Sequence, residues 1–115
     1  PDARILDDAA PTYVLVGERA PYGRVSRLEK IGASVIRAGH SRVDLGGAFE
    51  QLGAEGIERL MIEGGGEIIF SAFEAGLVDE LSVYVGSLIV GGRDAPTLAD
   101  GEGFDDGVLL TYSVE

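Results

Sequence analysis

Two short apolar runs in the first third of the chain predict buried strands. Residues 13–16 have the sequence YVLV and residues 34–37 the sequence SVIR, and both runs contain β-branched side chains. The polar stretch between them carries apolar side chains at three-residue intervals and ends at Gly32, which predicts a short helix with a glycine stop. The apolar positions of this helix are Val25, Leu28 and Ile31.

A second helix is predicted after the second strand. Ser41 is expected to be its N-cap, with Asp44 three residues later as a variant of the capping box. Gly53 is expected to close the helix. Apolar side chains fall on one face of it: Leu45, Ala48, Phe49 and Leu52.

The middle of the chain predicts a strand, a glycine turn and a helix in immediate succession. Residues 60–62, LMI, predict a third strand, and residues 64–66 are all glycine. Helical spacing then continues to Gly76. The apolar positions of this third helix are Ile69, Ala72 and Phe73.

The last third of the chain predicts strands without a helix between them. Apolar and polar positions alternate within residues 81–90, and residues 108–114 form a final apolar run. The order of strands and helices predicts an α/β fold whose sheet is mostly parallel and covered on both faces. Because no helix separates the last two strands, they are expected to pair antiparallel at one edge.

The charge balance narrows the classes of partner. The chain has 115 residues, 20 of them acidic and 9 basic, and its formal net charge is −11. Such an acidic surface repels a nucleic-acid backbone, so we expect no nucleic-acid binding. No apolar run approaches the roughly 20 residues of a membrane helix, so we expect no membrane partner. Lysine occurs only at Lys30, which favours adaptation to a salty cytosol over an ordinary acidic protein.

The chain contains no cysteine, which excludes disulfides and thiolate metal sites and fits a cytoplasmic location. No cluster has the spacing of metal ligands, so no metal is expected. No Ser-His-Asp set can be assembled, and no catalytic residue is assigned. His40 is open to acid–base chemistry or to a plain solvent-exposed role, the second being favoured. Arg19 and Arg24 are open to binding a phosphate or to surface ion pairs.

The glycine run of residues 64–66 is the main candidate for chemistry. A strand that ends in glycines leaves main-chain atoms uncovered, and the first N–H groups of the following helix lack partners within it. These donors and the positive end of the helix dipole suit a phosphate or pyrophosphate. The alternative is a tight turn that lets the helix pack closely on the strand. Glu63 can accept hydrogen bonds from a polar substrate, or it is a solvated acid.

Four segments resemble the C-terminal part of the riboflavin-biosynthesis reductase family, in particular the archaeal 2,5-diamino-6-ribosylamino-4(3H)-pyrimidinone 5′-phosphate reductases. They are MIEGGG at 61–66, GLVDEL at 76–81, GGRDAPT at 91–97 and DGEGF at 100–104. The resemblance implies a dihydrofolate-reductase-like three-layer sandwich and NADPH-dependent reduction of a phosphorylated ribosylaminopyrimidine. It also implies a homodimer, and that residues 1–115 are the cofactor-binding portion of a reductase domain whose N-terminal half is absent here.

The same resemblance assigns roles to individual positions. It implies that Glu63 meets the substrate. It implies that five residues bind the cofactor: Val43, Gly65, Gly66, Glu67 and Ile68. The competing hypothesis is a non-catalytic nucleotide-binding or dimerisation module derived from such a reductase.

Overall fold

The computed structural model describes residues 6, 9–95 and 97–107 and divides the chain into two compact units, Pro1–Leu60 and Met61–Glu115. The first unit holds strand β1 (Tyr13–Val16), helix α1 (Tyr22–Lys30), strand β2 (Ser34–Arg37) and helix α2 (Leu45–Ala54). The second unit holds helix α3 (Gly66–Glu74). Both predicted strands in the first unit and all three predicted helices are therefore confirmed.

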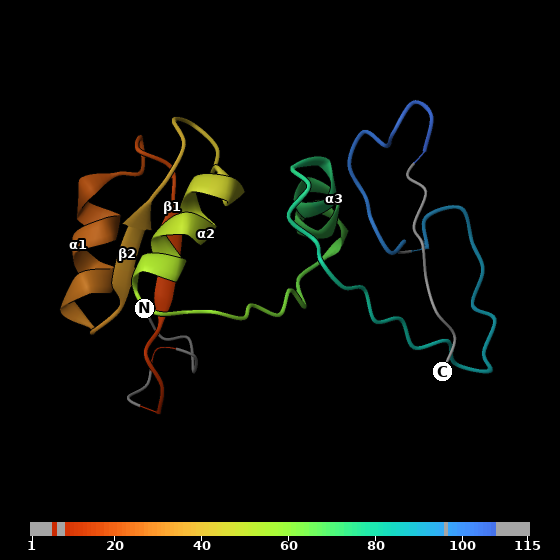
Figure 1. Ribbon diagram of the computed structural model, residues 1–115, viewed down its shortest axis with the longest axis horizontal. Helices are drawn as coiled ribbons and strands as arrows, with labels where there is room; N and C mark the ends of the chain where they lie inside the picture. The colour runs from red at the N-terminus through yellow and green to blue at the C-terminus, as the bar shows by residue number, and fades with distance from the viewer. Residues whose placement is uncertain (1–5, 7–8, 96, 108–115) are drawn as a thin grey trace. The chain divides into compact units, whose positions relative to one another are not determined.

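Strands β1 and β2 form a parallel pair within the first unit. Their register runs from Tyr13 opposite Ser34 to Val16 opposite Arg37, and the two strands lie between α1 and α2 (Figure 1). A parallel pair needs a crossover, and α1 supplies it. The buried side chains of this unit are small or branched, and they lie on these elements or directly beside β2: Val25, Ala33, Ile36, Ala38, Ala48 and Leu52. The α/β architecture with parallel pairing is thus confirmed, while the three-layer sandwich stays a prediction.

The start of α2 differs from the sequence prediction. Its N-cap is Asp44, not Ser41, and the Asp44 carboxylate accepts a hydrogen bond of 3.1 Å from the N–H of Gly46. The physical reason lies in the loop before α2, where the N–H of Asp44 donates to the carbonyl of Ala38 over 3.1 Å. This bond closes residues 38–44 into a loop, so the first helical turn begins only after Asp44.

The three helices end in the same manner. Each is followed by a glycine in the left-handed region, with φ of 92° at Gly32, 91° at Gly56 and 65° at Gly76. The residue after each glycine donates back into the last turn, as Leu77 does to the carbonyl of Ala72 over 2.9 Å. The stops at Gly32 and Gly76 were predicted. The stop expected at Gly53 was wrong, because α2 continues to Ala54 and ends before Gly56.

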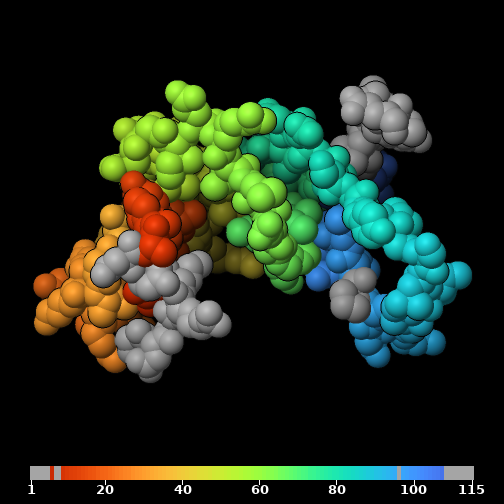
Figure 2. Space-filling view, turned by 90° about the horizontal axis from the view of Figure 1, so that it is seen from below, coloured from red at the N-terminus to blue at the C-terminus, as the bar shows by residue number. Residues whose placement is uncertain are grey.

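Residues 60–62 and 81–90 are not strands, so these two predictions were wrong. In the described part of the chain only β1 and β2 pair, and the backbone of both segments forms no ladder. The side chains are accordingly exposed, Met61 to 79% and Ile89 to 95%, and residues 81–90 form an extended strip, cyan in Figure 2. An alternating pattern favours an extended backbone, but a strand also needs a neighbour to bond to. The predicted strand 108–114, and with it the antiparallel edge, lies outside the described residues.

Among the described helices none combines the length and the apolar character that crossing a bilayer would require.

Candidate nucleotide site at the start of helix α3

The glycine run leads directly into α3, as predicted. Gly65 is the N-cap, with φ −52° and ψ 170°, and it has no side chain that could cap the helix. Its carbonyl accepts from the N–H groups of Ile68 and Ile69 over 3.1 and 3.3 Å. Within the described residues, the N–H groups of Gly66 and Glu67 have no hydrogen-bond acceptor. Two donors at the positive end of a helix dipole are therefore available to an anion.

The three glycines of this corner differ in what lies beside them. A side chain at Gly64 would come within 2.8 Å of Ile68 Cγ2, so the Ile68 side chain covers that position. A side chain at Gly65 would meet no heavy atom within 4 Å, so the N-cap is open to approach. At Gly66 the space is taken by Asp100, whose Cγ would lie 2.5 Å from an added Cβ. The corner is thus open at its centre and bounded on either side.

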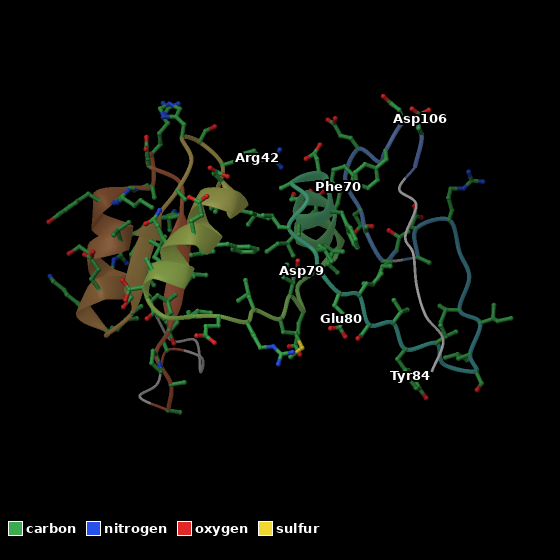
Figure 3. All side chains as sticks on the ribbon, viewed as in Figure 1. Arg42, Phe70, Asp79, Glu80, Tyr84 and Asp106 are labelled. Atoms are coloured by element: carbon green, nitrogen blue, oxygen red, sulfur yellow. The ribbon has the colours of Figure 1, made fainter. Side chains whose placement is uncertain are left out.

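A loop from later in the chain supplies the boundary at Gly66. Thr97 Oγ1 donates to the Asp100 carboxylate, and the ring of Phe104 lies 4.8 Å from that of Phe70 on α3. Figure 3 labels Phe70 on this helix. Gly101, with φ 96°, packs against the same Phe70 ring, which would lie 2.6 Å from an added Cβ. Sequence reasoning gave no role to Thr97 or Asp100. The available signal was their place in two of the four segments that carry the family resemblance.

Two carboxylates besides Asp100 stand close to the corner in sequence. Glu67 lies in the first turn of α3, where its negative charge interacts favourably with the positive end of the helix dipole. Its side chain is exposed. Glu63 comes directly before the glycines and is also exposed. These charges would oppose a phosphate, so the groups at this corner that favour an anion are the main-chain donors.

The structure brings most of the predicted site residues together. Gly65, Gly66, Glu67 and Ile68 form the N-cap and first turn of α3, and Glu63 precedes them by two residues. Val43 belongs to the first unit, where it is half-buried directly before the N-cap of α2.

Val43 lies in a pair of loops that follow the carboxyl ends of β1 and β2. The N–H of Glu18 donates to the carbonyl of Gly39 over 2.8 Å, which ties the two loops together. Ligands commonly bind at this end of parallel strands. The start of α2 is not an anion site, however, because Asp44 fills it with a carboxylate of the chain itself.

Basic side chains lie on these two loops and at the end of β2. Arg37 donates to the carbonyl of Glu18 over 3.0 Å, and His40 Nδ1 lies 3.7 Å from Glu18 Oε2. Arg19 and Arg42 are exposed, and across the described residues neither guanidinium has a polar partner (Figure 3 labels Arg42). Sequence reasoning considered Arg19 but missed Arg42, whose signal was its position beside Val43. Arg24 lies on α1 and is exposed.

Histidine and acidic side chains in the described ranges do not gather in groups of three that could hold a metal ion.

Comparison with known proteins gives one consistent result. The family model described as the RibD C-terminal domain matches residues 1–113. The chain is 52% identical over 106 residues to 2,5-diamino-6-ribosylamino-4(3H)-pyrimidinone 5′-phosphate reductase of Methanothermobacter thermautotrophicus, which covers 92% of this chain and 49% of that protein. It is 46% identical over 102 residues to the reductase of the same name from Archaeoglobus fulgidus, covering 89% of this chain and 46% of the relative.

A bacterial relative is more distant. The riboflavin biosynthesis protein RibD of Bacillus amyloliquefaciens is 32% identical over 100 residues, which is 87% of this chain and 27% of that protein. The chain therefore spans about half the length of the archaeal relatives and a smaller share of the bacterial one.

Proposed function

Because the chain belongs to the RibD C-terminal domain family, we propose that it is the cofactor-binding portion of a reductase in riboflavin biosynthesis. The reaction proposed is reduction of 2,5-diamino-6-ribosylamino-4(3H)-pyrimidinone 5′-phosphate, the compound named in the archaeal relatives, to its ribitylamino form. NADPH supplies the hydride, which is delivered to C1′ of the ribose.

The observation that carries the proposal is the uncapped start of α3. Gly65 leaves room for close approach, and the N–H groups of Gly66 and Glu67 are free to donate to the pyrophosphate. Ile68 covers the adjoining Gly64 and offers an apolar contact. We assign Val43 as a further cofactor contact, in the first unit.

Glu63 is proposed to hold the substrate, because its exposed carboxylate can accept hydrogen bonds from hydroxyl or amino groups. The preference for NADPH over NADH is assigned to unpaired arginines at the carboxyl ends of β1 and β2. Arg19 and Arg42 are the candidates, since a guanidinium binds phosphate through a two-pronged contact. We also propose that the full-length protein is a homodimer and that it works in a cytoplasm of high salt concentration.

The proposal is tested on the full-length protein at matched salt. NADPH binding is followed by nicotinamide fluorescence, and turnover by loss of reduced-nicotinamide absorbance when the ribosylaminopyrimidine phosphate is added. We expect binding that inorganic pyrophosphate competes away, together with substrate-dependent oxidation. No oxidation in the presence of substrate would refute the reductase.

A non-catalytic module is the second candidate, and one observation favours it. The exposed apolar strip of residues 81–90 is suited to self-association rather than to catalysis. This candidate predicts NADPH binding or dimerisation without turnover, so the same assay separates the two.

A further inference from the structure

Position 66 requires glycine because of a residue distant in sequence, Asp100, and not because of its backbone angles. Nine glycines of the described chain have a positive φ that other residues avoid, and Gly66 is not one of them. Its missing side chain instead makes room for Asp100, whose backbone nitrogen would lie 2.6 Å and whose Cγ would lie 2.5 Å from a Cβ at position 66. The conformation of Asp100 and the position of the first residue of α3 are therefore coupled.

Asp100 itself is fixed from two sides. The hydroxyl of Thr97 donates to Asp100 Oδ1 and also lies 3.1 Å from the carbonyl of Ala99, and Asp100 Oδ2 lies beside Gly66. The loop that carries both residues is anchored on α3 by the contacts of Gly101 and Phe104 with the Phe70 ring. No basic side chain of the described residues pairs with the Asp100 carboxylate, so its contacts are with Thr97 and the helix start.

From this geometry we infer that Asp100 is a positioning residue for cofactor binding, which holds Gly66 so that the N–H groups of Gly66 and Glu67 converge on one phosphate. This inference rests on the proposed function and adds to it a residue that contacts the site from the 97–104 loop. Asp100 acts by its shape and its bond to Thr97. Its negative charge opposes the phosphate, so the shape must provide more than the charge removes.

The test uses three variants of the full-length protein and compares NADPH dissociation constants. Asp100→Ala removes the contact and the bond to Thr97, and we expect the Kd to rise about tenfold, since misplaced donors lose much of their effect. Asp100→Asn keeps the volume and an acceptor for Thr97, so we expect binding as tight as the wild type or tighter. Thr97→Val leaves Asp100 in place but releases its rotamer, and an intermediate loss is expected.

The matched control is Glu102→Ala, which removes an exposed carboxylate from the same loop. Its Kd should equal that of the wild type. At saturating NADPH, kcat of Asp100→Ala should stay within about twofold of the wild type, because a high cofactor concentration compensates for weaker binding. A Kd unchanged in Asp100→Ala, or an Asp100→Asn variant as weak as Asp100→Ala, would overturn the inference.

A second readout separates this inference from the proposed function. Hydrogen exchange at the amides of Ile68 and Ile69, which donate to the carbonyl of Gly65 in the first turn, needs no cofactor, and it should be faster in Asp100→Ala than in Asp100→Asn. If the wild type binds no NADPH, the proposed function fails, while the exchange rates still report whether Asp100 fixes the helix start. Equal exchange in both variants would refute that role directly.

Discussion

Helices α2 and α3 both begin beside glycines, but only α2 has an acceptor on its own N-cap residue. Asp44 bonds the N–H of Gly46, whereas Gly65 offers no side chain to the start of α3. The start of α2 is therefore completed by the chain next to it, and the start of α3 keeps donors for something else. The comparison shows that a glycine N-cap leaves these first donors without an acceptor on the N-cap residue itself.

The largest expected effect tests how α2 is held. Gly39 has φ 78°, and an added Cβ would lie 2.6 Å from the nitrogen of Asp44, so Gly39→Ala should cost about 3 kcal/mol through strain and overlap. Gly32→Ala is the control, because its φ is 92° but no atom lies within 4 Å, and about 1 kcal/mol is expected. Urea unfolding measures both, and equal losses would show that the contact with Asp44 is unimportant.

The next prediction concerns a substitution that gives α3 an aspartate N-cap like that of α2. Gly65→Asp introduces an N-cap carboxylate into open space, which should raise the Kd for NADPH about tenfold by repulsion and by occupying the free donors. The same change should stabilise the protein by a few tenths of a kcal/mol. Gly65→Ala, with neither acceptor nor charge, is the control for added volume. If Gly65→Asp binds NADPH as tightly as the wild type, the pyrophosphate does not lie at this helix.

A smaller effect removes the cap from α2. Asp44→Ala should lower the free energy of unfolding by about 1 kcal/mol, because the N–H of Gly46 loses its acceptor. Ser41→Ala should change it by less than about 0.5 kcal/mol, since Ser41 is an exposed loop residue. Thermal unfolding of the two variants decides between them, and a larger loss for Ser41→Ala would restore the capping role that the sequence suggested.

The smallest effect concerns the charge on the first turn of α3. Glu67→Gln should cost about 0.3 kcal/mol of stability by weakening the interaction with the helix dipole. It should also tighten NADPH binding slightly, and both changes should fade as salt is added. Glu74→Gln at the other end of α3 should act with the opposite sign on stability. A Glu67→Gln effect that salt leaves unchanged would argue against electrostatics as its cause.

Elements set by neighbours in sequence were predictable. The apolar runs at 13–16 and 34–37 and the helical spacing before Gly76 gave the observed strands and helices, because spacing and glycine stops act locally. The glycine turn and the helix after it were likewise predicted from the sequence, since helix starts follow from the chain around them. The assignment of residues 65–68 to a cofactor came from the family resemblance and stays a prediction. Val43 came only from the family resemblance.

Features set by distant partners were not predictable. Residues 81–90 have the alternation of a strand, but no pattern within them says what they pair with. Asp44 rather than Ser41 caps α2 because the carbonyl of Ala38 binds its N–H, a bond that spacing does not show. Asp100 contacts Gly66 through a loop packed on Phe70, and this contact depends on the tertiary structure.

The exposed strip of residues 81–90 affects how readily the chain aggregates. It is a ten-residue stretch without charge, and Asp79 and Glu80 stand at its entrance, with Tyr84 exposed to 96% within it (Figure 3). Flanking carboxylates of this kind act as gatekeepers that keep open, β-prone stretches from stacking on one another. Since salt weakens such repulsion, the isolated chain should become more prone to aggregate as ionic strength rises, even though its overall acidity favours dispersal.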